Sequence, residues 1–396
     1  MKLLLLNGHG INLKVEGSKL FIKNGFYSLT EKSLEYVFLP KRIDIDHVII
    51  YGQDGNITID AIRWLIKHNI QISILNWDGK LLTTMLPSGS VQVKTRFIQY
   101  SAYSDNTRRL FVARKFLEAK FSRTQLVLDW LKERYPAINN DLTKEYTYFR
   151  KTKTISEMMM VEGRIAAFYW KEFNKIIPNK YSFETREYQK RPWGAGDIIN
   201  CMFNYGYAIL EAECLKAINS SGLDVHVGFL HEMNQSKNSL AYDFQEPFRF
   251  LIDLAIISAM ENNIMEKSDF IRTENYNLRL RPSGAKKLIN EIDKQLTKKS
   301  LFNNQMWSWR YILSEKVIEL SHYLQGKKTK LDFTTEYKID RQDSEVIRQK
   351  ILSISYEEWK KKGFSKGTLH YMKQNAKTNK PFTLNKHVEE RLIKKF

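Results

Sequence analysis

Cysteine is nearly absent from this sequence of 396 residues, which holds only Cys201 and Cys214. Two thiols cannot build a disulfide framework or a four-thiolate zinc site. No apolar run reaches the length of a membrane span, and the run at residues 3–6 breaks at the polar, glycine-containing residues 7–10. We therefore expect a chain without a signal peptide or membrane span, in the reducing cytoplasm of a cell.

Three well-known catalytic motifs are also missing. The sequence contains no G-x-S-x-G elbow, no G-x-x-x-x-G-K-[ST] phosphate loop and no C-x-x-C pair. Serine hydrolases, ATPases with a phosphate loop and thiol oxidoreductases are thus poorly supported. No internal repeat occurs.

Acidic residues are scarce relative to basic ones. Lys and Arg number 63 against 44 Asp and Glu, so the formal net charge is +19. Such an imbalance favours binding to a polyanion. A hydrophobic content of 43% is ample for packed cores and excludes a disordered chain.

The first part of the chain reads as β-rich. Short apolar runs alternate with turn signals at residues 2–6, 11–15, 19–22 and 47–51, and they predict strands. Helical spacing at residues 58–67 predicts one helix, followed by strands at residues 70–75 and 80–85. We predict a small β-rich N-terminal domain over residues 1–90.

After residue 91 the apolar period changes to that of a helix. Stripes with this period predict helices at residues 107–120, 122–134, 155–173, 196–219, 246–262 and 305–325. The predicted fold class is therefore α+β. An α-helical catalytic domain spans residues 91–326, and a linker with a helix follows at residues 327–354.

The tail, residues 355–396, is basic, with eleven Lys and Arg against four Glu. Ser355 to Glu358 fits a capping box, Gly363 can end that helix, and Ser365 can cap a second helix. This pattern predicts a helix-turn-helix DNA-binding module. The expected DNA contacts are Lys366, Thr368 and Lys373; the alternative is a solvated hairpin that only docks on the body.

Glu162 is unusual because it stands in an apolar helical stripe. The stripe consists of Ile155, Met158, Met159, Glu162, Ile165, Ala166 and Tyr169. An ionised carboxylate is costly in such a place unless it is paired or bound to a metal. The residues alone leave two interpretations open, an ion pair with an arginine of another helix or a metal ligand.

Three further polar residues follow an apolar run. His231 follows directly after the apolar run of residues 228–230. Asp243 and Glu246 stand three residues apart near a predicted helix start, just before Pro247. Taken singly, each fits a structural role, the carboxylates as helix caps and the imidazole as a buried, hydrogen-bonded group. Together with Glu162 they favour an oxygen-and-nitrogen site for Mg²⁺ or Mn²⁺.

Several motifs in order resemble the CRISPR-associated endonuclease and integrase family, the adaptation proteins numbered first among the Cas proteins. The motifs are Glu162-Gly163 with Ala166 and Tyr169, Arg191-Pro192 with Asp197 and Asn200, Gly222-Leu223-Asp224, Gly228-Phe229-Leu230-His231-Glu232, and the run from Ser239 to Arg249. The β-rich start also resembles the family's N-terminal domain. The resemblance covers about residues 1–325, and the ordered set is specific although each piece alone is weak.

The resemblance implies a metal site and a reaction. The family's metal ligands fall on Glu162, His231 and Glu246, with Asp243 as the neighbouring acidic residue. Arg191 and Arg249 belong to the motifs and are expected to contact DNA. The implied activity is metal-dependent joining of 3′-hydroxyl DNA ends to target DNA by transesterification, with DNA hydrolysis as a side activity.

The basic tail favours one enzyme over another, and the intact Glu162, His231 and Glu246 weigh against a third, non-catalytic alternative. Members of the family usually stop soon after the α domain, whereas an added C-terminal DNA-binding module resembles that of casposases, the relatives that serve transposons. A casposase acting on double-stranded transposon ends and target DNA, as a homodimer or larger homo-oligomer, is therefore favoured. The alternatives are a CRISPR spacer-acquisition integrase with a small adaptation partner, and a non-catalytic helix-turn-helix DNA-binding protein.

Overall fold

The computed structural model describes residues 3–26, 33–40, 42–52, 54–76, 79–87, 92–186, 195–273, 277–337, 339, 351–361, 363 and 365–377. The chain divides into two compact units, one of residues 1–256 with 265–337 and one of residues 257–264 with 338–396. Among the described residues, no helix combines the length and apolar character that a bilayer span requires.

The N-terminal region contains a mostly parallel sheet with the strand order β1-β5-β7-β8. Its strands are β1 (Leu3–Gly8), β5 (His47–Gly52), β7 (Gln71–Leu75) and β8 (Leu81–Met85). The strands β1, β5 and β7 pair in parallel, and only β8 runs antiparallel to its neighbour. The central strands are buried almost throughout, as is typical of parallel sheets covered on both faces.

A second sheet has the strand order β4-β3-β2-β6. Its strands are β2 (Ile11–Glu16), β3 (Lys19–Lys23), β4 (Glu35–Phe38) and β6 (Gly55–Ile57). The helix α1 (Ile59–Lys67) starts where the Thr58 side chain accepts a hydrogen bond from the Ala61 amide. The two sheets and this helix share one apolar core that includes Leu6, Leu13 and Trp64. The strands and the helix predicted for this region are confirmed, and β4 and β6 are additional.

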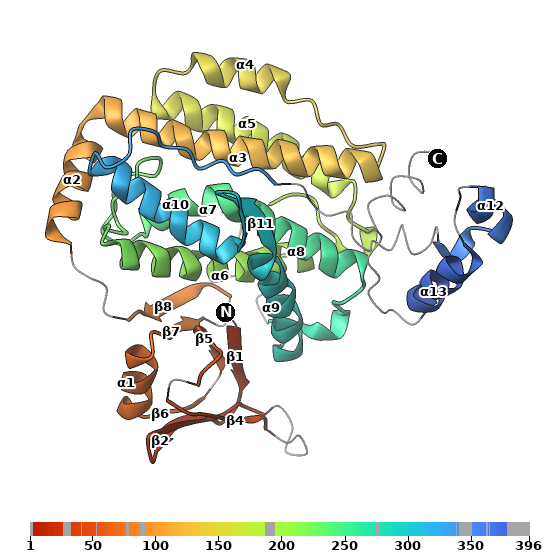
Figure 1. Ribbon diagram of the computed structural model, residues 1–396, viewed down its shortest axis with the longest axis horizontal. Coiled ribbons are helices and arrows are strands. Elements are labelled where there is room, and N and C mark those ends of the chain that lie inside the picture. The colour runs from red at the N-terminus through yellow and green to blue at the C-terminus, as the bar shows by residue number, and fades with distance from the viewer. Residues whose placement is uncertain are drawn as a thin grey trace. The chain divides into compact units, whose positions relative to one another are not determined.

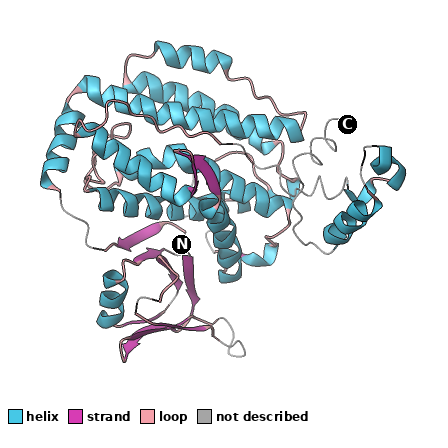
Figure 2. Cartoon of the chain, in the orientation of Figure 1, coloured by secondary structure: helices cyan, strands magenta, loops and turns pink. Residues whose placement is uncertain are grey.

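The rest of the first unit is mainly helical, as Figure 2 shows. Its helices are α2 (Val93–Ser104), α3 (Asn106–Arg134), α4 (Thr143–Lys151), α5 (Ile155–Asn174), α6 (Ile198–Ser221), α7 (Ser239–Gln245), the 3-10 turn η2 (Glu246–Phe248), α8 (Arg249–Glu261), α9 (Pro282–Thr297) and α10 (Trp309–Leu324). Short 3-10 turns η1 (Asn179–Tyr181) and η3 (Lys267–Asp269) connect some of them. The predicted α+β class is confirmed.

Helix α3 is one continuous helix, so the prediction of two helices at residues 107–120 and 122–134 is wrong. No Gly or Pro interrupts it, and Phe121, at the expected break, is fully buried on the same stripe as Phe116 and Leu117. Figure 1 shows α4, α5 and α3 side by side, and α3 packs against both α5 and η2. This packing brings α5 and η2 to the same helix.

Two hairpins interrupt the helical region. They consist of β9 (Phe270–Arg272) with β10 (Leu278–Leu280), and of β11 (Lys299–Phe302) with β12 (Gln305–Ser308). The predicted helix at residues 305–325 is therefore wrong in its first turn, which is strand β12. Asn303 and Asn304 both have positive φ between β11 and β12, the backbone that a tight hairpin turn of this kind requires.

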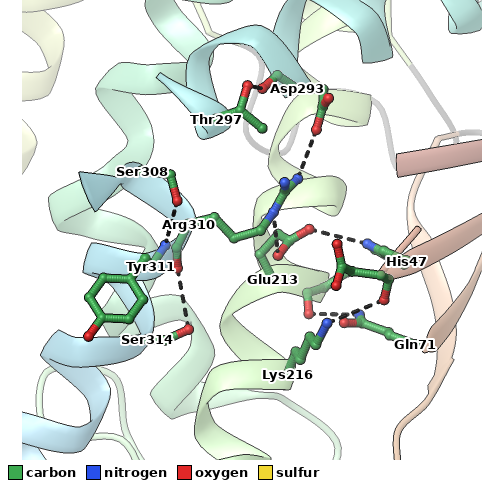
Figure 3. Close-up of polar contacts among 12 residues, drawn as sticks. His47, Gln71, Glu213, Lys216, Asp293, Thr297, Ser308, Arg310, Tyr311 and Ser314 are labelled. Carbon is green, nitrogen blue, oxygen red and sulfur yellow. Dashed lines mark hydrogen bonds and ion pairs between the residues drawn. The ribbon is translucent and has the colours of Figure 1, made fainter. Parts of the chain in front are cut away.

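A buried polar network joins the parallel sheet to the helices, as Figure 3 shows. Glu213 of α6 contacts His47 Nδ1 of β5 at 3.2 Å and Arg310 Nε of α10 at 3.0 Å. Arg310 Nη2 also donates to Asp293 of α9 at 3.1 Å. Four elements that are distant in the sequence are thus tied through Glu213 and Arg310.

The described residues of the second unit include the short helices α12 (Tyr356–Lys361) and α13 (Lys366–Lys377). Ser355 and Glu358 exchange hydrogen bonds between side chain and backbone, and Gly363 has a φ of +83°. Ser365 accepts the Thr368 amide. The predicted capping box, left-handed glycine and second cap are confirmed. Trp359 is fully buried in a core with Ile351, Leu369 and Met372.

Candidate active site

A cavity of about 640 Å³ lies among the elements that carry most of the predicted site residues. Helices α3, α5 and α8, the turn η2 and the loop before α7 supply its walls. The lining side chains are Lys120, Met159, Glu162, Gly163, Ala166, Ala167, Trp170, Thr185, Arg186, Leu230, His231, Glu246 and Arg249. Three of the four predicted catalytic residues, Glu162, His231 and Glu246, therefore share one cavity.

Glu162 projects from α5 toward α3. Its Oε1 accepts a hydrogen bond from Lys120 Nζ at 2.5 Å. Thr154 starts α5 with a complete capping box, and the buried Met158, Val161 and Ile165 fix the helix rotation that aims Glu162 at the cavity. The partner is a lysine of α3 and not the arginine that the ion-pair interpretation named.

Glu246 opens the turn η2 and is almost fully buried. Its Oε2 lies 2.5 Å from Lys120 Nζ, and its Oε1 lies 3.1 Å from Arg249 Nη2. Burial alone would raise the pKa of this carboxyl, but the Arg249 and Lys120 cations outweigh burial and lower the pKa to about 2. Glu246 is therefore ionised at neutral pH, and Lys120 bridges it to Glu162.

Asp243 binds the Nδ1 side of the His231 ring. Its Nδ1 lies 2.7 Å from Asp243 Oδ1, so Nδ1 carries the proton and donates to the carboxylate. Burial lowers the pKa of His231, but the hydrogen bond to Asp243 and its charge outweigh burial, and the pKa is raised. The Nε2 atom is left as the ring nitrogen that can serve a ligand, as in metal sites where a carboxylate orients a histidine.

Asp243 itself does not line the cavity; it organises the loop that carries His231. It is fully buried inside α7, and its carboxylate accepts the backbone amides of Phe229, Leu230 and His231 at 2.5, 3.0 and 2.9 Å. The structural alternative, in which Asp243 caps a helix start, is wrong. The residue lies within α7 and caps a loop, because that loop and not a helix end brings three amides to it.

Gly228 permits this close approach. A Cβ at this position would lie 2.8 Å from the His231 carbonyl oxygen and 2.9 Å from Asp243 Oδ2. Both distances are too short for a side chain without a shift of the loop. The glycine of the motif around His231 is thus explained by packing against α7.

Two arginines border the carboxylates. Arg249 stacks over the Tyr207 ring with its guanidinium carbon 4.8 Å from the centroid. Arg186 donates to Asn200 Oδ1 at 2.5 Å and to Asn204 Oδ1 at 3.0 Å. The cavity therefore carries both signs of charge. Arg191, the other predicted arginine, lies outside the described residues.

The donor set has the chemistry of a divalent-metal site. Two carboxylates and one imidazole are ligands suited to Mg²⁺ or Mn²⁺, and both carboxylates already converge on one cation, the Lys120 ammonium. As the side chains stand, no three His, Cys, Asp or Glu of the described residues are arranged to hold a metal ion. A metal-bound state thus requires side-chain movement.

The predicted DNA contacts of the tail all contact their own module. Lys366 is exposed at the start of α13, and its Nζ lies 5.6 Å from the centroid of the Tyr356 ring. Thr368 and Lys373 are less exposed and bind the Ser365 hydroxyl and the Ile354 carbonyl, each at 2.8 Å. The exposed side chains of α13 are those of Lys366, His370, Tyr371, Gln374 and Lys377.

The sequence reasoning missed Lys120, although a signal was present. Lys120 falls on the stripe of α3 that includes Phe116, Leu117 and Phe121, and it is as unusual there as Glu162 is in α5. A cation and an anion in two apolar stripes indicate an ion pair between the two helices. Gly163 was noted only as part of a motif; a Cβ there would meet no heavy atom within 4 Å.

Comparison with known sequences gives a family. The family model of "CRISPR associated protein Cas1" matches residues 4–294. A CRISPR-associated endonuclease Cas1 of Archaeoglobus fulgidus is 26% identical over 331 residues, which cover 79% of this chain and 95% of the relative. A second one, from Pyrobaculum aerophilum, is 30% identical over 241 residues, covering 60% of this chain and 77% of the relative.

Solved structures agree. A structure described as a casposase bound to integration product is 59% identical, covers 90% of this chain and all of that one, and has a TM-score of 0.84. A Cas1 protein of Thermotoga maritima, 19% identical, covers 85% of this chain and all of that one at a TM-score of 0.69, and so supports the fold. The chain therefore belongs to the Cas1 family, and over most of its length it is similar to a casposase.

Proposed function

We propose that this chain is a divalent-metal-dependent DNA integrase and endonuclease of the casposase kind, which joins 3′-hydroxyl DNA ends to target DNA. The observation that carries the proposal is the cavity in which Glu162, His231 and Glu246 meet, two of them on one shared cation. A non-catalytic DNA-binding protein would have no use for this arrangement. The 59% identity to a casposase solved with an integration product supports the same conclusion.

The cavity suits a phosphodiester substrate. Its volume of about 640 Å³ is in the range of small-molecule sites, and Arg186 and Arg249 can offset the charge of a phosphate there. Gly163 leaves open space on α5 beside Glu162, where a side chain would occupy room. The net charge of +19 adds long-range attraction for DNA.

The reaction is a direct transesterification, in which a 3′-hydroxyl attacks a phosphodiester and a strand with a free 3′ end departs. A bound Mg²⁺ or Mn²⁺, held by Glu162, His231 and Glu246, would lower the pKa of the hydroxyl and neutralise charge on the phosphate. Asp243 keeps the His231 ring oriented, and Arg249 holds Glu246 ionised. Water in place of the hydroxyl gives strand cleavage.

Sequence identity favours a casposase over a CRISPR spacer-acquisition integrase. The casposase structure is 59% identical to this chain, whereas the Cas1 protein of Thermotoga maritima, which covers 85% of the chain, is 19% identical. The exposed face of α13 is suited to lie in a major groove, with Lys366, His370, Tyr371 and Gln374 near the bases or the backbone.

The assembly follows from the reaction. Joining two DNA ends to two target strands requires two active sites, and a homodimer or larger symmetric assembly supplies them most simply. Double-stranded transposon ends and target DNA are the proposed partners.

The test is an oligonucleotide joining assay. A labelled duplex with a recessed or blunt 3′-hydroxyl is incubated with plasmid and the full chain in Mg²⁺ or Mn²⁺, and separately with EDTA. Joined product is expected with either metal and none with EDTA, and none with the Glu162→Gln protein although that protein still binds DNA. Wild-type joining in EDTA, or by Glu162→Gln, would overturn the proposal.

A further inference from the structure

We propose that Lys120 is the resident counter-cation of the active site, which holds Glu162 and Glu246 together until a divalent metal ion displaces it. This inference rests on the proposed metal-dependent function. It assigns to Lys120 a role in metal binding, which neither the cavity alone nor the family resemblance provides.

The geometry is that of one cation shared by two anions. Lys120 Nζ lies 2.5 Å from Glu162 Oε1 and 2.5 Å from Glu246 Oε2, so the two oxygens are at most 5.0 Å apart. An ion that binds oxygens at about 2.1 Å needs them within about 4.2 Å of each other. Lys120 thus keeps the carboxylates close to the spacing that a metal ion requires.

Burial strengthens the electrostatic interaction of Lys120 with the two carboxylates. Only 15% of the Lys120 side chain and 5% of that of Glu246 are exposed, so water can screen their charges only weakly. Without a cation, two carboxylates in this place would repel each other and Glu246 would lose one of its two charged partners. Lys120 therefore stabilises the metal-free protein in the form that is ready for metal.

The displaced ammonium has a place to go. A second, smaller cavity of about 40 Å³ is lined by Lys120 and also by Asp253, Tyr169 and Tyr207. Asp253 is buried and accepts hydrogen bonds from both tyrosines. Arg123 and Arg249 line the same cavity, and a turn of the Lys120 side chain toward Asp253 would keep the ammonium beside a carboxylate when the metal takes its former position.

Competition between Lys120 and metal has a measurable consequence. Removal of the ammonium should strengthen metal binding and weaken the metal-free fold, because the same contact opposes the first and supports the second. The experiment is calorimetric titration of MnCl₂ into chelator-treated full chain, for wild type, Lys120→Met and Glu246→Gln, with melting temperatures recorded with and without Mn²⁺.

A matched control lies on the same helix. Lys115 of α3 pairs with Glu118 at 2.7 Å, away from the two site carboxylates, so Lys115→Met removes a lysine of the same kind. Lys120→Met should bind Mn²⁺ at least about tenfold more tightly than wild type and melt lower without metal, with most of the loss restored by Mn²⁺. Lys115→Met should bind Mn²⁺ as wild type does.

The outcomes are distinguishable. Equal or weaker Mn²⁺ binding by Lys120→Met, with Glu246→Gln deficient, would overturn the role of Lys120 alone. Mn²⁺ binding that does not depend on Glu246 in any variant would instead overturn the proposed metal site. Lys120→Gln, which keeps a polar end, serves for the same titration if Lys120→Met does not fold.

Discussion

Two buried glutamates of this protein, Glu213 and Glu246, are alike in their burial and in the charged groups that they contact. Their side chains are 3% and 5% exposed, and each contacts an arginine and one further basic side chain. Burial would raise the pKa of both, yet Arg310 and His47 in one case, and Arg249 and Lys120 in the other, lower it to about 2. Both carboxylates are ionised at neutral pH.

Glu213 and Glu246 differ in whether their surroundings leave room for a ligand. Glu213 is enclosed by protein groups from β5, α6 and α10, and neither it nor its partners line the cavity of Glu246. Glu246 lines a cavity together with a second carboxylate and an imidazole. A buried, ionised glutamate is therefore no sign of function by itself. The sign is a cation that a ligand can replace beside a cavity that can admit it.

The largest effects are expected from exchanging each carboxylate for an amide. Glu246→Gln should reduce joining about a thousandfold or more, because several kcal/mol of transition-state stabilisation depend on the metal it holds. Glu213→Gln should cost about 3–5 kcal/mol of unfolding free energy, since Arg310 loses a buried partner. The joining assay measures the loss of activity in Glu246→Gln, and urea unfolding measures the loss of stability in Glu213→Gln.

The contrast between Glu213 and Glu246 fails if both substitutions affect stability and joining in the same way. An exposed glutamate of α3, Glu133, provides the control through Glu133→Gln, which should alter neither stability nor joining measurably. Equal loss of stability in Glu246→Gln and Glu213→Gln, with joining of the folded fraction unchanged, would place both glutamates in the same structural class.

A smaller effect is expected behind the cavity, at Asp243. Asp243→Asn keeps the size of the side chain but replaces a carboxylate oxygen with an amide nitrogen, and four contacts now depend on that carboxylate. Loss of such an orienting group typically costs tenfold to a hundredfold in activity or metal affinity. Joining rate and Mn²⁺ affinity should fall together by that amount. Wild-type values for both would show that His231 needs no support.

The smallest effect concerns the tail and compares neighbours on α13. His370→Ala removes an exposed side chain of the proposed DNA face and should weaken binding of the correct DNA end by about 1 kcal/mol, or roughly fivefold. Lys373→Ala removes the contact to the Ile354 carbonyl and should instead lower the melting temperature. Competition binding with terminal and scrambled duplexes distinguishes them. The reverse assignment would restore Lys373 as the DNA contact.

Much of the fold could be predicted because periodicity reflects burial directly. The alternation in β2 and the stripe of α5 are visible in the residues themselves, and their strands and helix were predicted within a few residues. The hairpin of β11 and β12 was missed although Asn303 and Asn304, with their tolerance of positive φ, signal a tight turn. The apolar stripe of the following helix was extended back to residue 305, so that it included β12.

The site could be predicted only in part, because its residues meet through tertiary packing. Glu162 was recognisable as a charge on an apolar stripe, but the same reasoning applied to Lys120 was needed to find its partner. Asp243 was interpreted as a helix cap, since nothing local indicates that the loop of residues 228–231 folds back onto it. Glu213 carries the same sequence signal as Glu162 and serves the structure.

The central claim is that the metal ion belongs to the cavity of Glu246 and not to the network of Glu213. Iron-directed cleavage of the backbone tests this claim most directly. Fe²⁺ takes the place of Mg²⁺ in the full chain, ascorbate and hydrogen peroxide are added, and the sites of backbone cleavage are mapped by mass spectrometry. The account predicts cuts near Glu162, His231 and Glu246 that excess Mg²⁺ suppresses and that Glu246→Gln abolishes. Cuts near His47 and Glu213, or cuts that persist in Glu246→Gln, would contradict it.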